Sequence, residues 1–160
     1  MNKETRIQKI QAIIERDKAT PFGKIEIPWE DNLVSKDVFK IPLEYLVYNK
    51  YNGRILSRTQ SLETQNYVID VETKEGKERI EDLLWQSNKQ RNDTTLKSIN
   101  DYGQQKVGII TRDGIIIDGN RRAMLLNRGK KYDYFKAVVL DVTLEENPLE
   151  IEKLETTYQM

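Results

Sequence analysis

Residues 107–129 read VGIITRDGIIIDGNRRAMLLNRG, and this stretch decides the fold. Two runs rich in β-branched residues flank Asp113-Gly114, a dipeptide typical of tight hairpin turns. The second run leads directly into Asp118–Arg122, the DGNRR segment, and an apolar helical run follows that ends at Gly129. The stretch therefore predicts a β-hairpin followed at once by a helix, with a glycine at the turn between them.

The DGNRR segment has the chemistry of a phosphate-binding turn. Gly119 allows a sharp backbone turn and close approach of a ligand. The first amides of the helix that follows lack intrahelical partners and carry the positive end of its dipole. Arg121 and Arg122 stand where the dipole disfavours them, and a bound polyanion would explain their position. The alternative is a tight turn whose arginines are solvated or paired with acids such as Asp118.

Upstream of this stretch, periodicity predicts three helices and one strand. Residues 3–17 place isoleucines on one helical face, which we expect to pack on the domain, with docking on a partner as the alternative. Residues 37–48 mix β-branched and aromatic residues around a proline, a pattern typical of an edge strand running into a turn. Residues 76–90 form the second helix. The third begins with Asp93 as its N-cap and stops at Gly103.

Downstream, residues 134–142 predict a buried strand, and Asn147-Pro148 starts a last helix with Asn as N-cap and Pro at its first position. We expect the domain to be cut within this helix. The fold class expected is α/β of the α+β type, a small mixed sheet packed with helices. It would span residues 37–160, with an N-terminal amphipathic helix and linker over residues 1–36.

Composition excludes several classes of chemistry. The chain has 26 acidic and 26 basic residues, so its formal net charge is zero, which argues against nucleic-acid binding by bulk charge alone but leaves a local basic patch open. It has no Cys and no His, which excludes disulfides, zinc sites of these residues and Ser-His-Asp triads. A metal would be a hard ion such as Mg²⁺, held by carboxylates and phosphates. No run approaches the ~20 apolar residues of a membrane helix, so we expect a cytoplasmic protein without a membrane partner.

Several motifs recur in an order that resembles the N-terminal domain of the ParB/sulfiredoxin superfamily. They are a first box at Asn49–Arg54, a helix end at Ser98-Ile99 with Gly103, a strand at Val107–Ile110, the GxRR box at Gly119–Arg122, and a third box at Leu154-Glu155 with Gln159. The resemblance covers residues 41–159, and the DGNRR form of the second box is its most specific part. Without a cysteine the chain cannot perform the chemistry of sulfiredoxin, although it can share the fold.

The resemblance implies a pocket for the phosphates of CTP, ATP or ADP. The residues that it assigns to nucleotide binding are Arg54, Gln104, Gly119, Asn120, Arg121 and Arg122. Arg121 and Arg122 would contact the phosphates, and Arg54 would approach from the opposite wall. Gly119 and Asn120 would offer backbone and side-chain donors.

Two carboxylates are the candidates for catalysis. The resemblance implies that Glu155 orients a water or a Mg²⁺ ion bound with the nucleoside triphosphate. Glu155 follows Ile151 by four residues, so it lies at the rim of the apolar stripe and can face the site. Asp118 is the carboxylate that we pair with it. The alternative for Glu155 is an ordinary acid on a helix surface.

Three functions remain open on the sequence. The first is a nucleotide-binding module, with slow hydrolysis, of a DNA-associated bacterial or phage protein that contacts DNA through regions outside this chain. The second is a Mg²⁺-dependent nucleotide-using enzyme of kinase or nuclease type in a phage-defence system. The third is a non-catalytic interaction domain in which DGNRR is structural. A homodimer is compatible with each.

Overall fold

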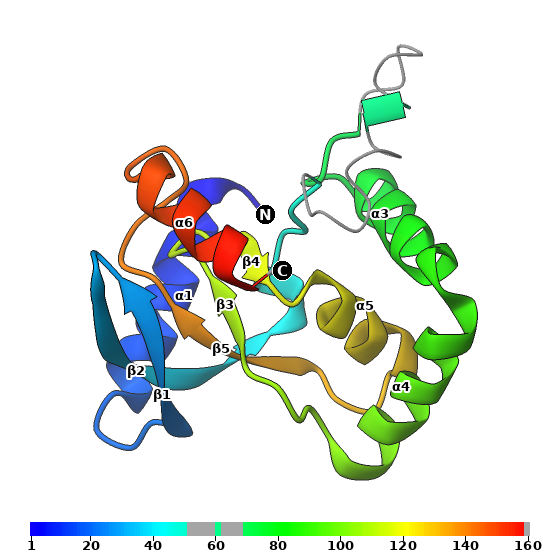
Figure 1. The fold of residues 1–160 in the computed structure, drawn as a ribbon, viewed down its shortest axis with the longest axis horizontal. Coiled ribbons are helices and arrows are strands. Elements are labelled where there is room, and N and C mark those ends of the chain that lie inside the picture. Colours follow the sequence, from blue (N-terminus) through cyan, green and yellow to red (C-terminus); the bar gives the residue numbers. More distant parts are fainter. Residues whose placement is uncertain (51–59, 62–68, 159–160) are drawn as a thin grey trace.

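The structure, a computed structural model, describes residues 1–50, 60–61 and 69–158. A five-stranded mixed sheet lies at its centre with helices packed on both faces, which confirms the α/β fold (Figure 1). The described helices are α1 (Lys3–Asp17), α3 (Lys74–Ser87), α4 (Lys89–Tyr102), α5 (Asn120–Gly129) and α6 (Pro148–Tyr158), with a short 3₁₀ turn at Leu43–Tyr45. The strands are β1 (Gly23–Trp29), β2 (Asn32–Pro42), β3 (Gly108–Ile110), β4 (Ile116–Asp118) and β5 (Tyr134–Val139).

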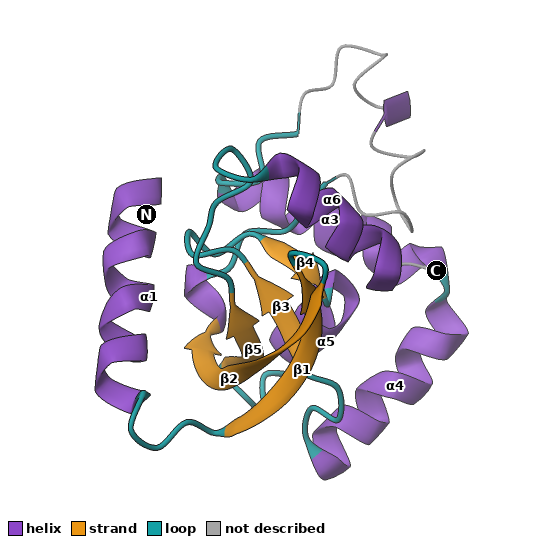
Figure 2. Cartoon of the chain, turned by 60° about the vertical axis from the view of Figure 1, so that its left-hand side comes forward, coloured by secondary structure: helices purple, strands orange, loops and turns teal. Residues whose placement is uncertain are grey.

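The sheet has the order β1-β2-β5-β3-β4, in which β3 and β5 are parallel and the other neighbours are antiparallel. Side chains alternate between its faces, so each strand contributes to two cores. Ile109 and Val138 belong to the core beneath α6. Ile110 and Ala137 belong to the larger core beneath α1, α3, α4 and α5. Figure 2 shows α1 along one side of the sheet, apart from the other helices.

The N-terminal part of the sheet differs from the sequence prediction. The prediction of an edge strand over residues 37–48 is wrong, because β2 lies between β1 and β5. Pro42 is the last residue of β2, where its missing N–H does not interrupt the ladder. Residues 1–36, predicted as a helix and a linker, also contain β1 and the start of β2. The turn between them uses Glu30 and Asp31 at φ of 51° and 65°, without the Asn-Gly signal that usually marks such turns.

The helices follow the expected patterns with one correction. Ile10 and Ile13 are buried, which confirms that α1 packs on its own domain. The N-cap of α4 is Asn88 and not Asp93, and the Asn88 side chain accepts a hydrogen bond from the Arg91 amide at 3.0 Å. Asn88 alone joins α3 to α4, so no loop composition marks the boundary. Among the described helices, none has the length and apolar character needed to cross a bilayer.

Candidate functional site

The DGNRR turn joins β4 to α5 as the sequence predicts. Gly119 adopts φ 116° and ψ 18°, which an L side chain rarely adopts. A Cβ atom added there would lie 2.6 Å from Cζ of Phe135, a fully buried ring. Both the backbone conformation and the close packing therefore require glycine at this position.

The N-terminus of α5 has no capping side chain, because its N-cap residue is Gly119. The other described α-helices are capped by Asn2, Thr73, Asn88 and Asn147. Within the described part of the chain, the amide groups of Asn120 and Arg122 have no hydrogen-bond acceptor. This leaves the positive end of the α5 dipole available to an anion.

Asn120 connects two distant segments of the chain. Its side chain is 1% exposed, its Nδ2 donates to the Asn49 carbonyl at 2.8 Å, and its Oδ1 accepts from the Asn49 amide at 3.1 Å. The sequence predicts a ligand donor in this side chain, but both of its polar groups bind Asn49. Asn120 therefore holds the start of the predicted first box against the N-terminus of α5.

Arg121 reaches across to α4. Its Nε donates to Oδ1 of Asn92 at 2.6 Å, and its Nη2 donates to Oγ1 of Thr95 at 2.8 Å and to the Arg91 carbonyl at 3.3 Å. Asn92 is fully buried, and its Nδ2 donates to the carbonyls of Leu84 and Trp85 at the end of α3. The guanidinium of Arg121 is thus held in place by the α3–α4 junction.

Arg122 forms an ion pair across the turn. Its Nη2 lies 3.4 Å from Oδ2 of Asp118, and its Nη1 donates to the Val107 carbonyl at 3.3 Å. Both side chains of the pair are largely buried, at 20% and 15% exposure. The sequence analysis gives an arginine paired with Asp118 as the alternative to phosphate binding, and the structure contains that pair. The pair engages the Asp118 carboxylate.

Helix α6 carries Leu154 and Glu155 of the third predicted box and contacts β4, whereas Gln159 of that box lies outside the described residues. Figure 1 shows α6 crossing in front of β4, and the two elements are in contact. Asp118 of the DGNRR turn is the last residue of β4, which α6 contacts. Burial raises the pKa of Tyr158 at the end of α6, and the charge of Asp118 raises it further. Glu155 lies one turn earlier on α6.

Glu155 differs from an ordinary surface acid. It is half-buried, and within the described residues it forms no hydrogen bond or ion pair. Burial raises its pKa, and the neighbouring charge of Glu152 adds to the shift. A carboxylate in such surroundings accepts a proton more readily than an exposed one.

Carboxylates are too few at this site to bind a metal by themselves. In the described ranges, no group of three or more Asp and Glu side chains is arranged around a common point. Asp118 is paired with Arg122, which leaves Glu155 as the available carboxylate of the two candidates. Mg²⁺ often binds through one or two carboxylates together with substrate phosphates. If a Mg²⁺ ion entered together with a triphosphate, Glu155 would be the one of the two candidate carboxylates left to contact it.

Two predicted site residues remain. Arg54 lies outside the described residues. Gln104 is buried, its Oε1 accepts from the Lys136 amide at 2.8 Å, and its Nε2 donates to the Lys136 and Lys106 carbonyls at 2.9 and 2.8 Å. Because both ends of its amide are engaged, Gln104 ties the α4–β3 loop to β5.

Sequence reasoning missed Asn49 as a partner of Asn120, did not single out Asn92, and placed Tyr158 only on the apolar face of the last helix. Asn92 sits inside a helix, where asparagine is usually unfavourable. An asparagine inside a predicted helix is therefore a sequence signal that its side chain has a structural role. No family model matches the chain, and no curated protein or solved structure shows a significant similarity to it.

Proposed function

We propose that this chain is a nucleotide-binding module with a ParB-like fold, which binds the phosphates of a nucleoside triphosphate at the N-terminus of α5. It would act within a DNA-associated bacterial or phage protein. One observation carries the proposal. Two hydrogen bonds join Asn120 to the backbone of Asn49, 71 residues away in sequence. The two segments that the ParB resemblance assigns to opposite walls of one pocket therefore start from a common point.

The local chemistry supports an anionic ligand. Gly119 provides no capping side chain, and the amides of Asn120 and Arg122 can donate to phosphate oxygens. Arg121 is anchored on α4, so less conformational entropy is lost when its guanidinium binds a ligand. Arg122 Nη2 lies 3.4 Å from Oδ2 of Asp118. A bound phosphate would compete with this carboxylate for the positive charge of Arg122.

Binding is tested by titrating the protein with ATP, CTP and GTP in the presence of Mg²⁺ in a calorimeter. We expect saturable binding that Arg121→Gln weakens about tenfold or more, because a hydrogen bond to a charged group contributes ~1.5–3 kcal/mol. Arg128→Gln is the matched control, since Arg128 lies at the opposite end of α5 and stacks on Trp85 at 3.8 Å. It should bind as the parent does.

Arg121 also holds α4, so its variants need a second comparison. Arg121→Lys keeps the positive charge but cannot reproduce the planar fork that contacts Asn92 and Thr95. It should bind more tightly than Arg121→Gln if the charge meets a phosphate. Each variant is measured well below its own melting midpoint. No heat with any triphosphate at millimolar concentration would exclude the proposed function.

A structural role for DGNRR is the second candidate, and the contacts of both arginines favour it. Arg121 binds α4 and Arg122 binds Asp118 without any ligand. Under this alternative the arginine variants lose stability, while the parent protein shows no change in melting temperature with any triphosphate. A ligand that binds only the folded state must raise that temperature, so the two candidates give opposite results.

Glu155 is the residue that we propose for hydrolysis, in which it would orient the attacking water. Glu155→Gln should retain triphosphate binding and lose phosphate release, because the amide keeps the size of the side chain but cannot accept the proton of the water. Asp141→Asn is the control, since Asp141 is an exposed acid before α6 and does not contribute to the pKa shift of Glu155. Phosphate release by Glu155→Gln at the parental rate would return Glu155 to the status of a surface acid.

A further inference from the structure

A cluster of basic and aromatic side chains lies on the part of the sheet that α6 leaves uncovered. Lys40 on β2 and Lys136 on β5 are directly opposite each other in the antiparallel register. Val38 and Val138 are the next opposite pair on the same face of the sheet, and both valines are buried in the core beneath α6. The sheet therefore continues from an apolar core into a charged, open surface.

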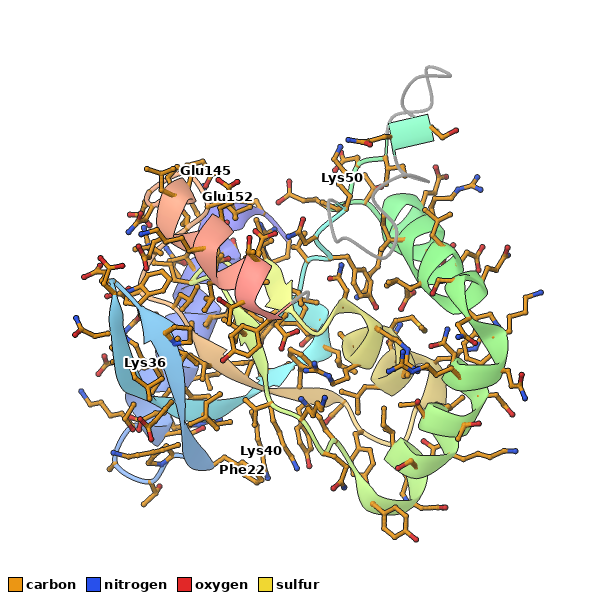
Figure 3. All side chains as sticks on the ribbon, viewed as in Figure 1. Phe22, Lys36, Lys40, Lys50, Glu145 and Glu152 are labelled. Carbon is orange, nitrogen blue, oxygen red and sulfur yellow. The ribbon has the colours of Figure 1, made fainter. Side chains whose placement is uncertain are left out.

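Phe22, just before β1, completes this cluster. Its ring is 51% exposed, and the ammonium groups of Lys40 and Lys136 lie 4.9 and 4.6 Å from its centroid. Lys40 also lies 5.0 Å from the ring of Tyr134. Figure 3 shows Phe22 and Lys40 side by side at the lower side of the molecule. We call these four residues, Phe22, Lys40, Tyr134 and Lys136, the Phe22 patch.

The Phe22 patch places two positive charges opposite each other on the sheet. Like charges directly opposite each other on a sheet are destabilising. Among the described residues, neither Lys40 nor Lys136 forms an ion pair with an acid. Their described contacts are with aromatic rings and, for Lys136, with the Gln104 carbonyl at 3.4 Å, and exposed cation–π contacts are weak, about 0.5–1 kcal/mol. An anion bound between the two ammonium groups would remove the repulsion.

A hollow of about 160 Å³ adjoins the patch. Tyr102, Tyr132 and Tyr134 line it, Lys136 forms part of its wall, and no acid is among its described lining residues. The rings of Tyr132 and Tyr134 pack edge to face with centroids 6.1 Å apart. Its volume is well below that of a drug-sized ligand site, ~300–1,000 Å³. A single planar ring is the kind of group that suits it.

Lysines and aromatic rings thus alternate along one surface. Beyond the hollow, Lys131 lies 5.8 Å from the ring centre of Tyr132. The order along the surface is Lys131, the tyrosine hollow, then the Phe22 patch. Proteins that bind single-stranded nucleic acid combine positive charge along the backbone with aromatic rings on which bases stack.

We propose that this surface binds a single strand of nucleic acid. The phosphates would lie between Lys40 and Lys136, one base would stack on the exposed part of Phe22, and another would enter the tyrosine hollow. An acidic peptide would satisfy the lysines but leave the rings uncovered. A duplex keeps its bases stacked inside and cannot insert one into the hollow. This inference goes beyond the proposed nucleotide site, since the surface contains no residue of the DGNRR turn.

The net charge of zero is compatible with nucleic-acid binding because the acidic and basic side chains are unevenly distributed over the surface. Residues 141–158 contain six acids and one lysine. In Figure 3, Glu145 and Glu152 from this segment lie at the opposite end of the molecule from Phe22 and Lys40. A strand with negative phosphates would therefore be directed to the Phe22 patch and away from α6.

The test uses fluorescence anisotropy with labelled oligo(dT) of about 16 nucleotides, the upper end of known single-strand site sizes. Phe22→Leu should weaken binding about fivefold or more, because the ring that stacks with a base is removed. Leu33→Ala is the control, since Leu33 is 67% exposed in the same hairpin at the far end of β2. It should bind as the parent does.

The lysines are tested through the salt dependence of binding. Lys40→Gln with Lys136→Gln should flatten the plot of log affinity against log salt by about 0.7 for each phosphate that the protein no longer neutralises. Lys24→Gln is the control, because Lys24 on β1 pairs with Asp37 at 3.6 Å. The double variant of Lys40 and Lys136 should bind triphosphate in the calorimeter as the parent does, which separates this proposal from the proposed nucleotide site.

Three results would overturn the proposal. One is an absence of oligo(dT) binding at low salt. Another is equal affinity for an abasic strand of the same length, which would show that the lysines attract phosphate charge without any base stacking. The third is equal affinity for a duplex. The proposal is supported if the parent protein binds oligo(dT) more tightly than the abasic strand and the duplex. Phe22→Leu should lose this preference.

Discussion

Asn120→Ala is expected to lower the free energy of unfolding by about 2–4 kcal/mol. The substitution removes both hydrogen bonds to the backbone of Asn49, a residue that is only 6% exposed. Loss of a partner by a buried polar group costs about 1–3 kcal/mol, and here an N–H and a C=O are affected together. Urea denaturation followed by circular dichroism measures the change.

Asn127→Ala is the matched control for this experiment. Asn127 lies on the same helix, but it is exposed, and its Nδ2 donates to the side chain of Glu81 at 2.8 Å. Its loss should cost less than about 1 kcal/mol, as is typical for surface positions. Equal effects of the two substitutions would mean that the link between Asn49 and α5 contributes little to stability.

Gly119→Ala is expected to destabilise the protein by a similar amount, about 2–4 kcal/mol. A side chain at φ 116° adds about 1–3 kcal/mol of backbone strain. The new Cβ would also lie 2.6 Å from Cζ of the fully buried Phe135, and overpacking a core costs about 1–3 kcal/mol. The two costs overlap, because a backbone shift that relieves one also relieves the other. Thermal unfolding measures the loss.

Gly23→Ala provides the comparison, since a Cβ at Gly23 would meet no atom within 4 Å and its φ is not in the left-handed region. This substitution should be neutral or slightly stabilising. Combining Gly119→Ala with Phe135→Leu separates strain from crowding. If crowding contributes, Gly119→Ala should cost less in the Phe135→Leu background. Equal stability of the two alanine variants would contradict the requirement for glycine at the turn.

Local sequence signals were sufficient for much of the fold. The run of residues 107–129 predicts β3, β4 and α5 because the turn residues and the apolar periodicity are adjacent in the chain. Gly103 ends α4 at φ 80°, with its amide donating to the Ile99 carbonyl. Asn147 caps α6 through its Oδ1. Each of these features depends on residues within a few positions of one another, so the sequence alone could predict them.

The candidate site was only partly predictable for the same reason. The sequence identifies Gly119 and the two arginines as unusual at a helix start, since their conformational and dipole preferences are local properties. It does not show that Asn120 binds Asn49 or that Arg121 binds Asn92. Those contacts join residues 71 and 29 positions apart. Only the packing of α5 against α4 and the segment after β2 brings them within hydrogen-bond distance.

By itself, then, the sequence determined the turns within residues 107–129, the end of α4, the start of α6 and the apolar faces of the helices, because steric preference and hydrophobic period act over a few residues. It did not determine the turn at Glu30 and Asp31 or the boundary at Asn88, which carry no such local signal. The tertiary structure alone decided which strands are neighbours. It places β2 beside β5, so that Lys40 faces Lys136. It also brings Phe22 onto both lysines. Strand register depends on the burial of whole sheet faces, and that free energy is a property of the assembled domain and not of any short segment.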